Sequence, residues 1–428
     1  MRKATTPLLL FAACLLSLTS WSQTEKVLFI GNSYTGYNNL PNLTALVANG
    51  AGDTLIHDAH TPGGNTIQMH ANNPAAIAKI YSNDWDHVVL QCQSQEPSFP
   101  LSQVQTQTFP YAASLCDTIR ANNACTRPIF YMTWGRENGD ASNCAAWPPV
   151  CTYEGMDSLL YQRYMQMGDD NEAYVSPVGA VWNFVRTNYP SWDLYTSDGS
   201  HPSQLGSYLA ALSFYTIIFE KSPMNSVYNY NFSQDLADSA RQAVEWVVYD
   251  SLPKWNVGEY DPVASFTWTS DRGGFPCPND TVYFDSYSEY TDIHYWDFGN
   301  GDTASGSLTQ AVYSMTGMYE VTLVVESCGK TDTISTNVPV FCAGVIEEGS
   351  FFEALELAPN PSKGRFRIRG KNAEVLEEVR VYDMSGREVG IWEPKGTEAE
   401  INIQEKGHYI LWVRDDSNVV YKTTIQVL

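Results

Sequence analysis

The sequence predicts an α/β domain built on a parallel sheet, followed by two small β-sandwich domains. Over residues 23–252, short apolar strands alternate with helices, a pattern typical of a parallel sheet covered on both faces. From 262 to 342 the helical signals give way to short strands separated by turns rich in Gly, Asp and Asn, as in a sandwich. Residues 354–428 are again rich in strand signals, and we interpret the segment 343–353 as a linker.

The first domain begins with the apolar strand Lys26–Ile30. A turn leads to a helix that carries Pro41 in its first turn, where proline is favoured, and that runs to about Val47. Later strands are expected at 54–60, 86–91 and 128–133, and later helices at 66–80, 104–122, 153–168, 178–188 and 203–220. Sites in parallel sheets lie at the carboxyl ends of the strands, so the loops after the strands are the first candidates for chemistry.

The strands expected in the second domain are short and alternate between apolar and polar residues. They lie at 263–269, 281–285, 293–298, 319–325 and 331–338. Such alternation buries one face of each strand against the opposite sheet.

The charge of the chain excludes some classes of partner. Acidic residues number 48 and basic residues 25, which gives a net charge of −23. Binding to nucleic acid or to anionic lipid needs a basic face, so neither is expected. Residues 23–252 and 253–353 each carry a net −12, whereas residues 354–428 carry only −1.

The N-terminus, residues 1–22, has the features of a secretory signal peptide. Arg2 and Lys3 precede an apolar run over 7–16, and the small residues Ser20 and Ser22 precede the expected cleavage point. The apolar run is too short for a comfortable membrane span, and no other stretch is long and apolar enough for one. Lipidation at Cys14 is the less favoured alternative.

Eight cysteines remain after Cys14 is removed with the signal peptide. An even number in an oxidising compartment favours disulfides, and no spacing typical of a metal site is present. Two pairs are close in sequence, namely Cys116 with Cys125 and Cys144 with Cys151. We therefore interpret the cysteines as disulfide staples, and their pairing stays open.

A serine follows the first strand directly, in Gly31-Asn32-Ser33. A serine at a strand-to-helix turn can present its hydroxyl at the rim of the sheet, where the helix N-terminus supplies N–H donors. An ordinary structural turn is the alternative interpretation of this short motif.

A histidine precedes the last helix, in the segment Asp198–Pro202. A serine hydroxyl becomes nucleophilic when a base takes its proton, and histidine suits this task at neutral pH. A carboxylate three residues before the histidine can orient its ring. The alternative is an Asx-turn that caps the helix.

Three kinds of donor could stabilise an oxyanion at the same edge of the sheet. They are the backbone N–H of Ser33, a backbone N–H at Gly64 after the second strand, and a side-chain amide in Gln91–Gln95 after the third. The alternative interpretation of Gln91–Gln95 is a polar loop with no role in catalysis. The order Ser, Gly, Gln, Asp, His, at the first, second, third and last elements of one parallel sheet, is less expected by chance than any single motif.

The chain from about 25 to 250 resembles the SGNH/GDSL-type esterases and lipases. Gly31-Asn32-Ser33 matches their first block, with Asn where Asp is common, Gly64 matches the second-block glycine, and Asp198–Pro202 is close to their last block. The resemblance implies a flavodoxin-like, three-layer α/β/α fold. It also implies Ser33 as nucleophile, His201 as base and Asp198 as the acid that orients it.

The third block departs from the pattern of this family. A Gly-x-Asn-Asp motif is usual there, and this chain has Gln91-Cys92-Gln93-Ser94. Either Gln91 or Gln93 is expected to replace the usual Asn as oxyanion donor, beside the N–H groups of Ser33 and Gly64. Asn32 is a candidate for substrate binding.

Two residues after the fourth strand are further candidates for the pocket. Trp134 and Arg136 lie in the segment Thr133–Arg136 and could line it. Loop packing is an equal alternative for both.

The second domain resembles a PKD domain, an extracellular spacer or interaction module. Tyr295–Gly301 matches its central signature, and Tyr313, Gly317 and Tyr319–Leu323 match its later strands. We favour a role as a spacer over a role in binding a polysaccharide.

The third domain resembles the C-terminal sorting domain of type IX secretion. Leu357–Gly364, Val381–Arg387 and Lys406–Ile410 match its motifs. The resemblance implies that the type IX machinery exports the chain, with removal of residues 354–428 and release or attachment at the cell surface.

These features together indicate a secreted serine esterase that acts on short-chain O-acyl or O-acetyl esters of a carbohydrate. The acidic charge weighs against strongly anionic polymers as substrates, and the mechanism needs no metal or organic cofactor. A lipase or thioesterase is one alternative, and a catalytically inactive surface adhesin that binds glycans is another.

Overall fold

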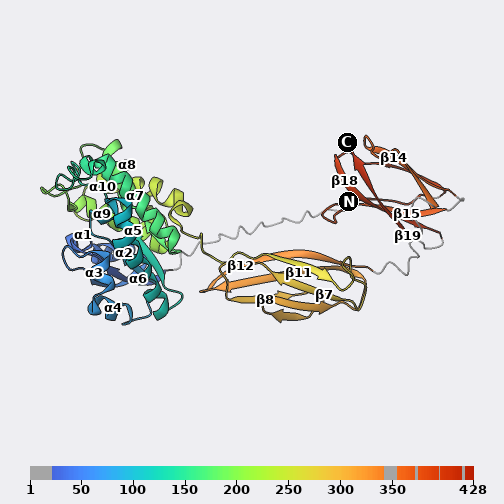
Figure 1. The fold of residues 1–428 in the computed structure, drawn as a ribbon, viewed down its shortest axis with the longest axis horizontal. Helices are drawn as coiled ribbons and strands as arrows, with labels where there is room; N and C mark the ends of the chain where they lie inside the picture. Colours follow the sequence, from blue (N-terminus) through green and yellow to red (C-terminus); the bar gives the residue numbers. More distant parts are fainter. Residues whose placement is uncertain (1–21, 342–353, 372–374, 395, 417–419) are drawn as a thin grey trace, which may run out of the picture. The chain divides into compact units, whose positions relative to one another are not determined.

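The computed structural model describes residues 22–341, 354–371, 375–394, 396–416 and 420–428 (Figure 1). The predicted signal peptide, apart from Ser22, and the predicted linker 343–353 lie outside these residues. The chain forms two compact units. The first runs to Pro262 and includes the later segment Glu326–Thr331, and the second comprises Val263–Val325 and Asp332–Leu428.

The first unit is built on a five-stranded parallel sheet with the strand order β2-β1-β3-β4-β5. The strands are β1 Thr24–Ile30, β2 Thr54–His60, β3 His87–Leu90, β4 Arg127–Tyr131 and β5 Tyr174–Ser176. This order is that of flavodoxin-like folds, in which sites lie at the carboxyl ends of the strands. The predicted fold class of this domain is confirmed.

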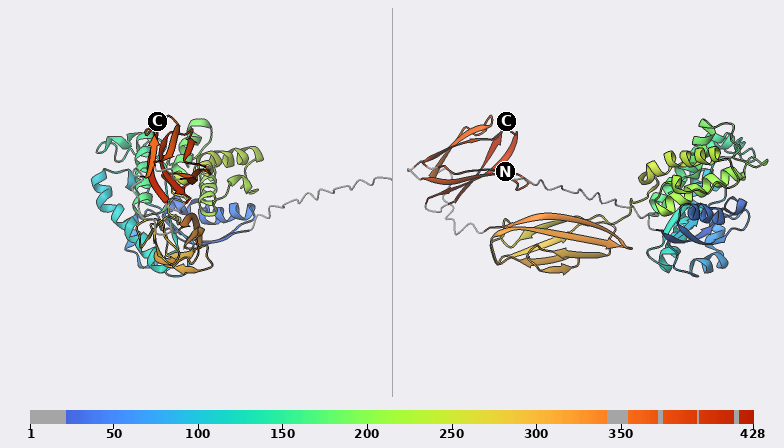
Figure 2. Two further views of the ribbon diagram at one scale, coloured as in Figure 1. Left: turned by 90° about the vertical axis from the view of Figure 1, so that its right-hand side faces the viewer. Right: turned by 180° about the vertical axis from the view of Figure 1, so that it is seen from behind.

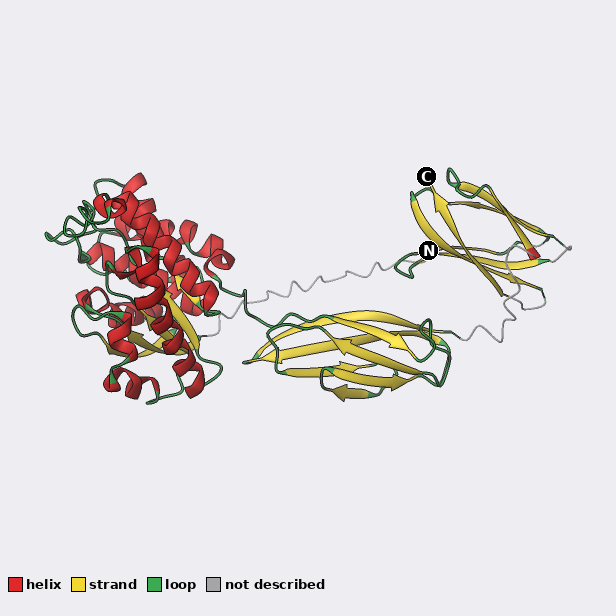
Figure 3. Ribbon diagram, in the orientation of Figure 1, coloured by secondary structure: helices red, strands yellow, loops and turns green. Residues whose placement is uncertain are grey.

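Helices flank the sheet on both sides (Figures 2 and 3). The helices and 3-10 turns are α1 Ser33–Gly36, η1 Tyr37–Asn39, α2 Leu40–Gly50, α3 Ile67–Ala71, α4 Pro74–Ile80, η2 Glu96–Ser98, α5 Leu101–Gln107, α6 Phe109–Asn122, η3 Pro148–Cys151, α7 Tyr153–Asp170, α8 Val178–Asn188, α9 Gln204–Phe219, η4 Pro223–Asn225, α10 Gln234–Val247 and η5 Tyr249–Trp255. One layer contains α2, α8, α9 and α10, which pack on one another. The other contains α3, α4, α6 and α7, as right-handed crossovers require.

Prolines break two of the predicted helices. The helix expected at 66–80 is two helices, because Pro74 starts α4 and has no N–H to continue α3. The helix expected at 104–122 is likewise divided into α5 and α6, with Pro110 in the first turn of α6. Strand β5 and helix α10 were not predicted.

The core explains why the site residues stand at one edge of the sheet. Residues Val27–Ile30 of β1 and Val88–Leu90 of β3 are fully buried, and every residue of α9 from Leu205 to Phe219 is buried. These apolar runs fix the strands and α9 in the interior. The polar residues that follow each strand must therefore emerge at its carboxyl end.

Among its described residues, the second unit is built of β-strands, apart from one helical residue at Ala354 (Figure 3). Its first part has sheets of order β10-β7-β6 and β12-β11-β8-β9, with Phe284 and Trp296 buried in the core. The strands are β6 Phe266–Ser270, β7 Thr281–Ser286, β8 Ile293–Asp297, β9 Thr303–Ser305, β10 Leu308–Val312, β11 Gly317–Ser327 and β12 Lys330–Val340. The predicted sandwich is confirmed, and β9 and β10 are additions to it.

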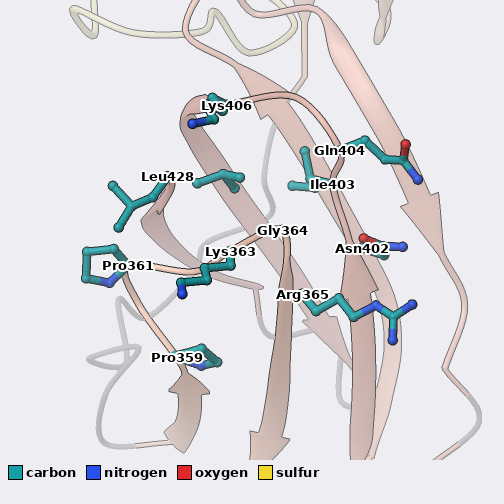
Figure 4. Close-up of a pocket in the computed structure, with 11 residues that line it drawn as sticks. Pro359, Pro361, Lys363, Gly364, Arg365, Asn402, Ile403, Gln404, Lys406 and Leu428 are labelled. Carbon is teal, nitrogen blue, oxygen red and sulfur yellow. The ribbon is translucent and has the colours of Figure 1, made fainter.

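The last part of the chain also forms two antiparallel sheets, of order β13-β14-β17 and β16-β15-β18-β19. The strands are β13 Leu355–Ala358, β14 Arg365–Gly370, β15 Leu376–Asp383, β16 Glu388–Trp392, β17 Glu398–Asn402, β18 Gly407–Asp415 and β19 Val420–Val427. A pocket of about 730 Å³ lies here, and the basic residues Lys363, Arg365 and Lys406 line it together with Leu428 (Figure 4). It shares no residue with the candidate triad.

The expectation that all eight cysteines form disulfides is wrong. Cys144 pairs with Cys151 and Cys125 pairs with Cys328, and Cys277 is also disulfide-bonded. Cys92 and Cys116 are free and completely buried. Both pack in the core as small apolar side chains do.

Among the described residues, no helix combines the length and apolarity needed to cross a membrane.

Candidate active site

The turn after β1 holds Ser33 at the rim of the sheet. Gly31 is required there, because a Cβ at this position would lie 2.3 Å from Thr35 Oγ1 and 2.7 Å from Gln91 Oε1. Asn32 caps α1, and its Oδ1 accepts from the N–H of Tyr34 at 3.1 Å. Ser33 is the first residue of α1 and stays half-buried.

The segment before α9 carries the histidine. Gly199 adopts a φ of +64°, and the Asp198 Oδ1 accepts from the backbone N–H of Ser200 at 2.8 Å and of His201 at 2.9 Å. This is the Asx-turn that was the alternative interpretation of the motif. The turn leaves the other carboxylate oxygen, Oδ2, free to face the imidazole.

The structure brings the three predicted residues into one chain of hydrogen bonds. Ser33 Oγ lies 2.8 Å from His201 Nε2, and His201 Nδ1 lies 2.5 Å from Asp198 Oδ2. Burial opposes ionisation of Asp198, but the hydrogen bonds from His201, Ser200 and Thr196 outweigh it and hold the pKa of this carboxyl well below its usual range. An ionised Asp198 fixes the ring so that Nε2 can accept the proton of Ser33.

Aromatic side chains surround the imidazole. Tyr37 stacks on it with ring centroids 4.3 Å apart, and Tyr34 meets it edge-on at 5.3 Å. The Tyr34 hydroxyl lies 2.6 Å from Ser200 Oγ. We did not predict either tyrosine, although their positions one and four residues after Ser33 were a signal that they share its surroundings.

The two predicted backbone donors are available. Among the described residues, no acceptor is found for the backbone N–H of Ser33 or of Gly64. Gly64 has a φ of +73°, a conformation that favours glycine, and a Cβ there would meet open space. Asn32, the candidate for substrate binding, is instead buried and ties the two turns together, since its Nδ2 donates to Asn65 O at 3.1 Å.

Gln91 and Gln93 occupy different environments. Gln91 is completely buried, its Oε1 accepts from Asn32 N and Thr35 Oγ1 at 2.9 Å each, and its Nε2 donates to Cys92 O. Gln91 therefore shapes the nucleophile turn, and we do not retain it as an oxyanion donor. Gln93 is half-buried and its Nε2 makes only 3.2 Å contacts with Ser94 and Gln95, which leaves it as the candidate.

Trp134 and Arg136, the two candidates that follow β4, also differ in burial. Trp134 is completely buried between Tyr34 and Trp182, with centroids 4.9 and 3.7 Å away, so it packs the site from behind and is not retained as a substrate contact. Arg136 is half-buried and pairs with the buried Asp140 at 3.1 Å. Its positive charge lowers the pKa of the Tyr34 hydroxyl, whereas burial raises it and prevails.

Two family models match the later parts of the chain. Residues 263–340 match the PKD domain, and residues 356–427 match the secretion system C-terminal sorting domain. The second match identifies a chain exported by type IX secretion to the extracellular space or the cell surface. No curated protein compared with the chain matches it.

Several solved structures are similar to parts of the chain. A DUF4886 family protein from Bacteroides uniformis is 17% identical, covers 54% of this chain and 95% of its own, and has a TM-score of 0.46. A protein assigned to the SGNH hydrolases from Slackia heliotrinireducens is 26% identical, with coverages of 45% and 97% and a TM-score of 0.38. The PKD1 domain of Vibrio anguillarum Epp is 31% identical, with coverages of 19% and 93% and a TM-score of 0.16.

Proposed function

We propose that the first unit is a serine esterase that forms an acyl-enzyme on Ser33. The observation that supports this most strongly is the continuous hydrogen-bonded chain from Ser33 through His201 to Asp198, with distances of 2.8 and 2.5 Å. A nucleophile, a base and an orienting carboxylate in such contact are what acyl transfer requires.

The reaction proceeds in two halves. Ser33 Oγ attacks the ester carbonyl carbon while His201 Nε2 takes its proton, and the oxyanion that forms accepts from the N–H groups of Ser33 and Gly64 and from the Gln93 amide. His201 then gives the proton to the departing alcohol oxygen as the C–O bond breaks. A water molecule, deprotonated by His201, next attacks the acyl-enzyme and releases the acid and free Ser33.

The substrate is a short-chain acyl ester, foremost an O-acetyl group, on a neutral carbohydrate. Three observations support this class. The chain is exported, and its first two domains each carry a net charge of −12, which repels anionic polymers. Tyr37, exposed beside His201, also offers an aromatic face on which a sugar ring can lie.

Acetate release from a panel of neutral and anionic acetylated glycans tests both the reaction and the substrate. The wild-type protein should release acetate fastest from the neutral glycans, and Ser33→Ala should release none. Equal release by Ser33→Ala would refute the role of Ser33, and glycan binding without release by the wild type would favour the adhesin.

The mature protein is proposed to lack the sorting domain, residues 354–428. Mass spectrometry of the exported protein should give a mass that ends before Ala354. Recovery of the whole segment on the exported protein would contradict this proposal.

A further inference from the structure

A buried carboxylate lies beneath the loops of the candidate oxyanion site. Glu96 opens η2, in the segment that follows β3, and only 7% of it is exposed. Carboxylates are rarely buried to this extent unless they are paired or hydrogen-bonded. The triad does not use this group.

The contacts of Glu96 join two loops that are distant in sequence. Its Oε2 accepts from the backbone N–H of Ile67 at 3.2 Å and from the backbone N–H of Gln93, also at 3.2 Å. Its Oε1 accepts from Thr108 Oγ1 at 3.3 Å. Ile67 begins α3, three residues after Gly64, so a single oxygen atom connects the Gly64 loop with the Gln93 loop.

We propose that Glu96 is a positioning residue that fixes the Gly64 loop relative to the Gln93 loop, so that donors from both face one oxyanion. This inference rests on the proposed esterase function. A donor displaced by a fraction of an ångström stabilises the transition state less, although the substrate still binds. Loss of Glu96 should therefore lower kcat and leave KM almost unchanged.

The charge state of Glu96 adds a second signature. Burial raises the pKa of this carboxyl to about 7, against the hydrogen bonds from Ile67, Gln93 and Thr108, which lower it. The titratable groups that interact with it are the Cys92 thiol and the Tyr164 hydroxyl, whose pKa values burial raises well above their ordinary values, so both are neutral at this pH. Since an ionised acceptor binds N–H groups more strongly, the connection between the loops strengthens as pH rises through about 7.

Two variants and a matched control test the proposal. Glu96→Leu removes the acceptor, and Glu96→Gln keeps an acceptor oxygen that no longer ionises. The control is Asp53→Asn, because Asp53 is another buried carboxylate of the same unit, where it pairs with Lys221 at 2.8 Å and accepts from the Tyr215 hydroxyl at 3.2 Å. Asp53 precedes β2 and so lies at the opposite end of the strand from Gly64.

The readouts are ester hydrolysis and hydrogen exchange of the Ile67 and Gln93 amides. In Glu96→Leu, both amides should lose protection and kcat should fall about 10- to 100-fold, with KM within about twofold of wild type. Glu96→Gln should recover most of this loss, and the ratio of wild-type to Glu96→Gln kcat should rise across pH 7. Asp53→Asn should change neither amide and leave kcat unaltered.

Two results would overturn the inference. One is unchanged protection of both amides in Glu96→Leu and Glu96→Gln, and the other is unchanged kcat despite lost protection. If Glu96→Leu does not fold, Glu96→Gln and its pH-dependent ratio decide the matter. If the wild-type protein hydrolyses no ester, the proposed esterase function is refuted instead. Hydrogen exchange of the Ile67 and Gln93 amides then still shows whether Glu96 joins the two loops.

Discussion

The ring of Tyr37 lies against the imidazole of His201, with centroids 4.3 Å apart and an angle of 20° between the ring planes. The next residue, Asn38, fastens the same segment to the chain that carries the histidine, since its Nδ2 donates to Ser203 O at 3.1 Å and Ser207 Oγ at 2.8 Å. The nucleophile turn and the base are thus held together by contacts outside the triad.

Replacing Tyr37 tests whether the stacked ring supports catalysis. Tyr37→Leu should lower kcat/KM about 2- to 10-fold, because a stacked aromatic pair contributes about 0.5–1.5 kcal/mol and the ring also favours the protonated imidazole of the transition state. Tyr37→Phe keeps the ring and should remain close to wild type. Steady-state kinetics on an aryl acetate measures both, and equal losses in the two variants would show that the hydroxyl matters instead.

Adding a methyl group at Gly31 should damage the nucleophile turn. Gly31→Ala places a Cβ against Thr35 Oγ1 and Gln91 Oε1, and overpacking of this kind costs about 1–3 kcal/mol of unfolding free energy. Urea denaturation should show this loss together with reduced hydrolysis. Gly36→Ala is the matched control in the same turn, since its Cβ would meet Thr61 Oγ1 at an ordinary 3.5 Å. A Gly31→Ala protein as stable and active as Gly36→Ala would contradict the geometry.

The buried Asp157 predicts a component of stability that falls as pH rises. Burial raises the pKa of this carboxyl to about 6, against hydrogen bonds from Asn183 and Gly135. The folded state therefore holds more protons than the unfolded state between about pH 4 and 6, and stability decreases over that interval by about 3 kcal/mol. Urea denaturation across this range should show that Asp157→Asn lacks this decrease. Parallel pH curves for the variant and the wild type would refute the assignment.

The buried thiols of Cys92 and Cys116 should resist alkylation in the native protein. Both are completely buried, and burial raises the pKa of the Cys116 thiol to about 12 and that of Cys92 well above its ordinary value. Neither forms the reactive thiolate at neutral pH. Iodoacetamide should label both in urea without reductant and neither in buffer. Labelling of Cys116 or Cys92 in buffer would place that thiol near the surface.

The sequence was sufficient to predict the architecture and to select the three residues of the candidate triad, because each depends on local patterns. Apolar runs predicted β1 to β4, and Ser33, Asp198 and His201 lie in short motifs that end strands or precede a helix. Strand β5 escaped notice because it has only three residues, Tyr174–Ser176, between two helices. Helix α10 was missed although its amphipathic pattern was present in the sequence.

What the sequence left open concerns where a side chain points or which distant residue it meets. Gln91 and Gln93 are the same residue type two positions apart, and only the fold buries one completely against the Ser33 turn and leaves the other half-buried. The sequence also allowed Trp134 to face a ligand, whereas in the fold its ring stacks on Trp182. The partner of Cys125 is Cys328, 203 residues away, and the nearby Cys116 is free, so proximity in sequence could not settle the pairing.

Covalent labelling by a fluorophosphonate, followed by mass spectrometry of the labelled peptide, tests the central claim most directly. The wild-type protein should take up one label on Ser33, Ser33→Ala should take up none, and His201→Ala should react far more slowly because Ser33 lacks its base. Labelling at another residue, or equal labelling of the wild type and Ser33→Ala, would contradict the account.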